Sequence, residues 1–226
     1  MEDRMKLIDK ALEEGRKTLS EYESKQILTV YQIPVTREIW VDDVKDLSEA
    51  TREMGYPLVL KGCSFDISHK TERGLIRVDI RNDKEARAAF EEIMTHMDGS
   101  QKAVLVQEMV EGKRELVIGL TRDAQFGPCV MFGLGGIFTE ILKDISFRVA
   151  PLEKRDALDM MQEIKGHKIL EAVRGMEAAD LDGLAEILIT VGRIGLENER
   201  IEEIDINPVI ISGSKPVAVD ALVVLS

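Results

Sequence analysis

Residues Glu203–Val209 read Glu-Ile-Asp-Ile-Asn-Pro-Val, and two isoleucines extend the run to Ile211. This largely apolar stretch predicts a strand, and a second apolar run at Pro216–Val224 predicts its neighbour. Proline cannot donate a hydrogen bond to a strand ladder, so Asn207-Pro208 indicates a local break whose reason goes beyond stability. The chain is therefore expected to close with two strands.

Upstream of this pair the sequence indicates a sheet with covering helices. Three apolar runs follow one another with little helix between them, at Ala103–Gln107, Glu115–Leu120 and Pro128–Phe132. Apolar residues at helical spacing then predict helices at Arg155–Lys165 and Asp182–Ile194.

The first half of the chain alternates helices with strands. Helices are predicted at Met5–Glu14, at Val44–Met54 and through Ala86–Met97, and a further helix is predicted to begin at the Ser20/Glu23 capping box. Strands are predicted at Glu38–Val41, Pro57–Leu60 and Leu75–Ile80. A polar turn at Asp98-Gly99-Ser100 is the candidate boundary between two lobes. We expect an α/β (α+β) fold with an N-terminal helix in residues 1–20 packing on the second lobe, a first lobe in 21–100 and a second in 101–226.

The composition excludes several classes of protein. With 226 residues, 44% hydrophobic and 32% charged, the chain has the balance of a folded globular protein. A net charge of -12 disfavours binding to nucleic acid or to an anionic membrane. Cys63 and Cys129 form no CxxC pair or Cys/His cluster, and no apolar run suits a signal peptide or a membrane span. We expect a cytoplasmic protein without a disulfide framework or zinc site.

A polar loop, Phe65–Gly74, carries His69, one of three histidines in the chain. A neutral imidazole can accept a phosphoryl group and return it, although spacing alone favours a surface histidine in a turn. Lys61 ends the preceding strand, where its ammonium could meet a phosphate or simply be solvated.

Two further segments could contact a nucleotide. Glycines in Phe132–Ile137 could let backbone N–H groups approach an anion, although a tight turn is equally compatible and no Walker A sequence follows. The joint Val104–Val110 could read an adenine edge, with Glu108 or Glu115 accepting hydrogen bonds from an amine or a ribose hydroxyl, or it could be a simple hinge.

The closing strands carry the candidate metal ligands. If the strands pair, Asn207 and Asp220 could meet on one face, and their oxygen atoms suit Mg²⁺ held jointly with phosphates. Polar residues at strand edges are the alternative.

In this order the segments resemble the beta subunit of ADP-forming acetyl-CoA (acyl-CoA) synthetases, within the ATP-grasp superfamily. The resemblance rests on strings that span nearly the whole chain: Glu21–Lys25, Gly55–Lys61, Ser68–Lys70, Val106–Val110, Gln125–Pro128, Met131–Phe138, Phe147–Leu152 and Glu203–Val209.

This resemblance implies a two-lobed ATP-grasp fold, Mg²⁺ as cofactor and ATP or ADP as substrate. Its implied nucleotide contacts are the Lys61 ammonium, a backbone amide at Gly74, the adenine hinge Glu108, Met109 and Val110, and Glu115 on the ribose side. The resemblance also implies that His69 is transiently phosphorylated and that Asp205 steadies the phosphohistidine. It implies a phosphate loop formed by Gly133, Gly135 and Gly136. The implied Mg²⁺ ligands are Asn207 and Asp220.

The reaction implied by the resemblance converts acyl-CoA, ADP and phosphate into carboxylate, CoA and ATP. The family's alpha subunit carries the CoA site and the first phosphohistidine, so the chain is expected to work only in an alpha–beta complex, a heterotetramer. Leu75 departs from the Gly-Gly that related chains often have after the histidine loop. Two alternatives remain: another ATP-grasp carboxylate ligase, or a non-enzymatic nucleotide-binding module from a fused acyltransferase.

Overall fold

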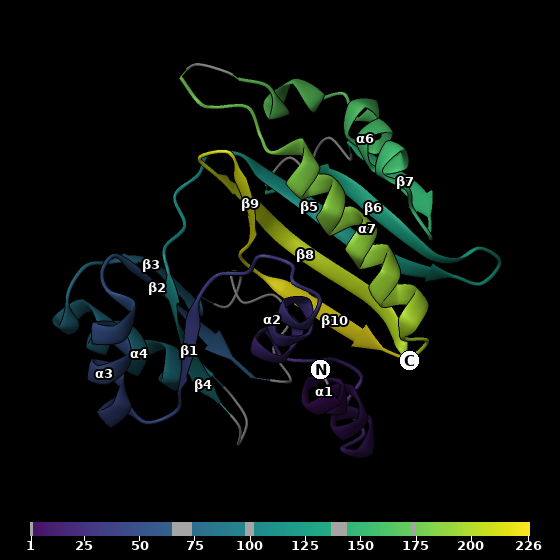
Figure 1. The fold of residues 1–226 in the computed structure, drawn as a ribbon. Coiled ribbons are helices and arrows are strands. Elements are labelled where there is room, and N and C mark those ends of the chain that lie inside the picture. The colour runs from purple at the N-terminus through teal and green to yellow at the C-terminus, as the bar shows by residue number, and fades with distance from the viewer. Residues whose placement is uncertain (1, 65–73, 98–101, 137–143, 173–174) are drawn as a thin grey trace. The chain divides into compact units, whose positions relative to one another are not determined.

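The computed structural model describes residues 2–64, 74–97, 102–136, 144–172 and 175–226 (Figure 1). The chain divides into two compact units, each with its own hydrophobic core. Unit 1 comprises residues 1–19, 23–35 and 111–226, and unit 2 comprises residues 20–22 and 36–110. The polar turn at 98–100, predicted as a lobe boundary, lies outside the described residues.

Unit 2 contains a four-stranded antiparallel sheet in the order β1-β4-β2-β3. Its elements are β1 (Glu38–Val41), α3 (Val44–Met54), β2 (Leu58–Cys63), β3 (Ile76–Ile80), α4 (Asp83–His96) and β4 (Ala103–Glu108). Local chemistry sets the helix ends: Asp43 caps α3 by accepting from the Lys45 N–H, and Asn82 caps α4 by accepting from the Glu85 N–H. Both helices pack their apolar faces onto the sheet.

Unit 1 contains a six-stranded antiparallel sheet in the order β10-β8-β5-β6-β7, with β9 also pairing with β8. Its strands are β5 (Glu115–Asp123), β6 (Gly127–Leu134), β7 (Ile145–Val149), β8 (Ile201–Ser212), β9 (Lys215–Ala218) and β10 (Ala221–Leu225). Its helices are α1 (Glu2–Glu13), α6 (Lys154–Glu163), the 3₁₀ helix η1 (His167–Leu170) and α7 (Leu181–Glu197), together with most of α2 (Glu21–Val30).

Figure 1 shows α6 and α7 lying across one face of this sheet. The buried residues of α7 pack against β5 and β6 in a core that also includes Ile204, Ile206 and Val209 of β8. Because successive strand residues point to opposite faces, the side chains between these core positions point to the other face of the sheet.

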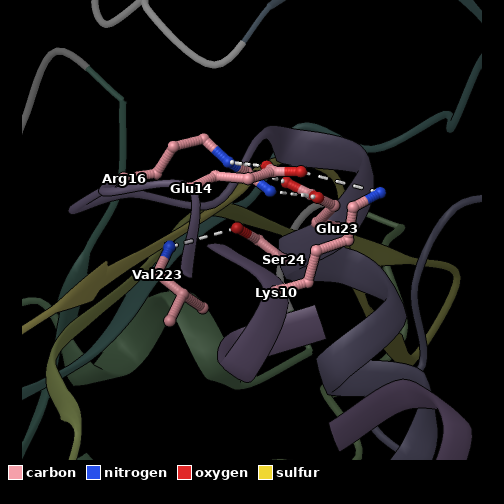
Figure 2. Close-up of polar contacts among 6 residues, drawn as sticks. All are labelled: Lys10, Glu14, Arg16, Glu23, Ser24 and Val223. Atoms are coloured by element: carbon pink, nitrogen blue, oxygen red, sulfur yellow. Dashed lines mark hydrogen bonds and ion pairs between the residues drawn. The ribbon is translucent and has the colours of Figure 1, made fainter. Parts of the chain in front are cut away.

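Polar contacts attach the N-terminal segment to unit 1 (Figure 2). The Arg16 guanidinium donates to both carboxylate oxygens of Glu23, and the Ser24 hydroxyl accepts from the Val223 N–H of β10. Ile8 and Ala11 of α1 belong to the same core. The first helix thus packs as part of unit 1.

The predicted α+β class is confirmed, but one strand prediction was wrong and one strand was missed. The run Pro216–Val224 forms two strands, β9 and β10, because successive parts of β8 pair with them separately. Strand β7 was not predicted. Its apolar residues Ile145, Phe147 and Val149 are exposed while Ser146 is buried, so the usual inward placement of apolar residues is reversed.

Asn207-Pro208 does not end β8 but adds a residue to it. Against β5, Ile206 pairs with Ile118 and Val209 with Leu116, so three steps along β8 match two along β5. This is a β-bulge, and it switches which alternate residues face the core. The predicted disturbance of the ladder therefore takes the form of a register shift.

Candidate active site

The backbone of unit 1 brings Asn207 and Asp220 together. The Asn207 N–H donates to the Asp220 carbonyl oxygen across 3.2 Å, and the Val219 N–H donates to the Pro208 carbonyl oxygen across 3.0 Å. Both contacts lie where β8 changes partner from β10 to β9, at the bulge. The two predicted Mg²⁺ ligands are thus neighbours, although 13 positions separate them in sequence.

Asp205 lies two residues before Asn207, between core residues Ile204 and Ile206, and so points to the face opposite α7. Burial, and then the neighbouring carboxylates of Glu203 and Asp220, raises the pKa of Asp205 to about 6. The bulge region therefore concentrates negative charge on one face of the sheet.

These residues fit a magnesium ion. Mg²⁺ prefers oxygen ligands and commonly uses one or two protein side chains, with water and substrate phosphates completing the shell. Among the described residues, no group of three or more His, Cys, Asp or Glu side chains is placed to hold a metal. One carboxylate and one amide beside each other suit an ion that is shared with a nucleotide.

The described part of the glycine segment is held against β5. The Gly135 N–H donates to the Glu115 carbonyl oxygen at 2.8 Å, and a Cβ added at Gly135 would lie 2.8 Å from backbone atoms of Glu115 and Leu116. Gly136 has a φ of +62°, and a Cβ there would collide with the Glu115 carboxylate. Only glycine permits this approach, which brings the predicted ribose contact next to the predicted phosphate loop.

Asp144 anchors the chain beyond this segment. Its buried carboxylate accepts the N–H groups of Lys165 and Gly166, each at 2.7 Å, and its carbonyl oxygen accepts the Leu134 N–H at 3.3 Å. The end of β6 is thereby attached to the turn before η1.

In unit 2, Lys61 is almost fully buried in β2. Its Nζ donates to Oε1 of Glu21 at 2.8 Å, and the side chains are 5% and 1% exposed. The predicted phosphate ligand is thus paired with a buried carboxylate, rather than solvated as the plainer sequence interpretation allowed.

The predicted adenine hinge ends β4. The Glu108 carboxylate accepts the backbone N–H of Arg37 at 2.9 Å and its Nε at 2.8 Å. Met109 and Val110 follow at intermediate exposure, and unit 2 ends at Val110. Arg37 therefore orients the carboxylate that was expected to read an amine or a ribose hydroxyl.

His69 lies outside the described residues, while Gly74 and Leu75 lie inside them. Gly74 has a φ of +66°, and the Leu75 carbonyl oxygen accepts the Gly62 N–H at 2.8 Å. Leu75 is fully buried in the core of unit 2. Where related chains often have a second glycine, this chain thus has a leucine that is buried in the core of unit 2.

The sequence interpretation missed four residues that shape these groups: Glu21, Arg37, Glu203 and Asp144. Glu21 had a signal, since it opens the charged string Glu21–Lys25, but charge in a helix usually indicates a solvated face. Its burial follows from a contact 40 positions away, which no local pattern encodes.

Comparison with known proteins identifies the family. The family model described as an ATP-grasp domain matches residues 10–225. The chain is 44% identical to the beta subunit of ADP-forming acetate–CoA ligase I from Pyrococcus furiosus, over 97% of this chain and 96% of that subunit. It is 37% identical to ADP-forming acetate–CoA ligase I from Archaeoglobus fulgidus, but spans only 32% of that longer chain.

A solved structure agrees over the whole chain. It is the acetyl-coenzyme A synthetase 1 of Candidatus Korarchaeum cryptofilum, described as a complex with coenzyme A and Mg-AMPPCP whose phosphohistidine segment points towards the nucleotide-binding site. The TM-score is 0.87 with 44% identity, covering 99% of this chain and 100% of that one. The chain therefore belongs to the ATP-grasp family, among the beta subunits of ADP-forming acetate–CoA ligases.

Proposed function

We propose that this chain is the nucleotide-binding beta subunit of an ADP-forming acyl-CoA synthetase, an acid–thiol ligase that works with a separate alpha subunit. The overall reaction is acyl-CoA, ADP and phosphate giving carboxylate, CoA and ATP. The observation that carries this proposal is the full-length similarity to a beta subunit with that activity in its name. The adjacency of Asn207 and Asp220 at the β8 bulge supports it independently of the similarity.

In the last step, the terminal oxygen of ADP attacks the phosphorus of phosphorylated His69. The P–O bond of ATP forms while the P–N bond breaks, and the imidazole leaves with that electron pair. Asp205, whose pKa is raised to about 6 by burial and by neighbouring carboxylates, is proposed to steady the phosphohistidine. No external oxidant or reductant is needed.

Phosphoryl transfer depends mainly on alignment and on neutralising charge. Lys61 supplies a fixed ammonium, and backbone N–H groups of Gly133, Gly135 and Gly136 form the phosphate loop. Mg²⁺, held by Asn207 and Asp220, would neutralise phosphate charge when bound. Glu108, Met109 and Val110 contact adenine, Glu115 the ribose, and a Gly74 backbone amide the phosphates.

The alpha subunit carries the CoA site and the first phosphohistidine, so the beta chain alone should not turn over acyl-CoA. We place the complex in the cytoplasm, which Cys63 and Cys129 support because neither cysteine forms a disulfide. Among the described helices, none is long and apolar enough to cross a membrane.

The test is phosphoenzyme formation. With terminally radiolabelled ATP, the wild-type chain should retain an acid-labile, base-stable label on filters, and His69→Ala should retain none while still binding Mg-ADP. Label on the His69→Ala protein would exclude the relay through this residue. A base-labile acyl phosphate without protein label would instead indicate a carboxylate ligase of another ATP-grasp class.

A further inference from the structure

Glu21 and Lys61 form a buried ion pair within unit 2. The Lys61 ammonium donates to Glu21 at 2.8 Å, and both residues are nearly inaccessible to solvent. An ionised side chain is strongly disfavoured in such a place unless an opposite charge meets it. Each residue therefore makes the burial of the other possible.

The surroundings of Lys61 explain why a counter-charge is needed. Every residue of β2 is buried, and Lys61 pairs in the strand register with Leu105 of β4 and Ile76 of β3. Its neighbours Leu60 and Gly62 contact the core beneath α4. Strand alternation therefore puts the Lys61 side chain on the sheet face away from α3 and α4.

The N-terminal turn of α2 provides the counter-charge on that same side. Residues 20–22 group with unit 2, and the ring of Tyr22 lies 5.6 Å from that of Trp40, which pairs with Leu105 in the register of β1 and β4. Glu21 thus reaches Lys61 from an element that the Tyr22 contact also attaches to the sheet.

We propose that Glu21 is a positioning residue, whose carboxylate holds the Lys61 ammonium where the phosphate chain of the nucleotide meets it. This inference rests on the proposed function, because it requires that Lys61 contacts phosphate. A lysine side chain has a flexible four-carbon stem and three N–H donors, of which Glu21 takes one. Holding the stem before the nucleotide arrives reduces the ordering cost of binding and aligns the charge for transfer.

The proposal separates two parts of nucleotide recognition. Glu21 acts through Lys61, so its loss should weaken ligands that carry the phosphate chain and leave adenosine unaffected. A purely structural role would weaken adenosine, ADP and ATP alike. Glu23 provides a matched control, because it is a buried glutamate of the same helix whose carboxylate pairs with Arg16 in unit 1 (Figure 2).

The experiment uses the alpha–beta complex with Glu21→Gln, Lys61→Met, the double variant and Glu23→Gln. Calorimetry with Mg-ADP and with adenosine should show at least about a tenfold loss of ADP affinity for Glu21→Gln, the scale of one charge-assisted hydrogen bond, and an unchanged adenosine affinity. The double variant should bind ADP no more weakly than Lys61→Met, because both changes remove one interaction. Glu23→Gln should bind ADP within about twofold of the wild type.

Each other result overturns the inference. If Glu21→Gln binds ADP normally while Lys61→Met does not, Glu21 has no positioning role and the nucleotide function stands. If Lys61→Met binds ADP normally, the phosphate role of Lys61 fails, and wild-type phosphoenzyme formation judges the family function separately. If Glu21→Gln does not fold, the double variant and Glu21→Asp decide: a double variant that binds ADP more weakly than Lys61→Met, or a Glu21→Asp variant that loses adenosine affinity as much as ADP affinity, would contradict positioning.

Discussion

The backbone N–H of Asn207 donates to the carbonyl oxygen of Asp220 at the bulge in β8, where one strand exchanges β10 for β9 as its partner. A bulge re-aims the side chains on either side of it. Here it brings the backbones of Asn207 and Asp220 together, an arrangement that supports the proposed joint binding of one hard cation. This relationship leads to the first prediction.

Asn207→Ala or Asp220→Asn should make ADP binding nearly independent of Mg²⁺. Each change removes one oxygen ligand or its charge, and the loss of affinity with Mg²⁺ present should be about 10- to 100-fold, the scale of one charge-assisted contact. Calorimetric titration of ADP with and without Mg²⁺ measures this. Glu202→Gln on the same strand is exposed and serves as control. If ADP binding by both variants still depends on Mg²⁺ as in the wild type, then Mg²⁺ is bound by other residues.

Asp205→Asn should stabilise the folded chain at neutral pH while abolishing transfer through His69. In the folded state the pKa of Asp205 rises from 3.8 to about 6, so folding favours its protonated form. Below pH 3.8 the residue is protonated in both states and has no linkage effect. Between about pH 3.8 and pH 6 the wild type loses stability, because the unfolded state releases this proton while the folded state keeps it, and above about pH 6 the loss is complete.

The gain from Asp205→Asn should therefore grow between about pH 4 and pH 6 and stay constant above, reaching on the order of 2 kcal/mol. Urea unfolding at pH 4 and pH 7.5 measures the difference. A gain of the same size at both pH values would mean that the raised pKa is not its source.

Gly135→Ala should disrupt the predicted phosphate loop. Its Cβ would lie 2.8 Å from backbone atoms of Glu115 and Leu116, which cannot move as a flexible side chain does. We expect a loss of about 1–3 kcal/mol in the free energy of unfolding, and a loss of Mg-ADP binding.

Gly213→Ala is the matched control for this loop, because its φ is +60° and no atom lies within 4 Å of the added Cβ. Left-handed strain alone should cost about 1 kcal/mol, with ADP affinity unchanged. Equal effects of the two alanines on ADP binding would argue against a role of the Gly135 backbone in the site.

Asp144→Ala should destabilise unit 1 by about 2–3 kcal/mol, because it leaves the N–H groups of Lys165 and Gly166 without their acceptor. Asp144→Asn keeps one acceptor oxygen and should cost about half as much. Thermal unfolding of the wild type and of both variants measures which substitution costs more stability. If Asn is as damaging as Ala, the negative charge of Asp144 matters more than its hydrogen bonds.

Local periodicity was enough to predict most helices and strands. The helix Val44–Met54 and the strand Glu38–Val41 were predicted with the bounds that the structure has, because spacing, caps and Gly55 act within a few residues. Strand β7 was not predicted because its apolar residues face outward. The division between β9 and β10 was not predicted because a run of apolar residues does not reveal how many strands pair with it.

The sequence by itself determined the α+β class, the apolar strands and the strings that connect the chain to its family, since these depend on residue order. Only the tertiary structure decided that β8 contains a bulge at Asn207-Pro208 and that Lys61 is buried against Glu21. The reason is physical: strand register and buried ion pairs are contacts between distant residues, and their energies depend on the whole sheet around them rather than on the adjacent sequence.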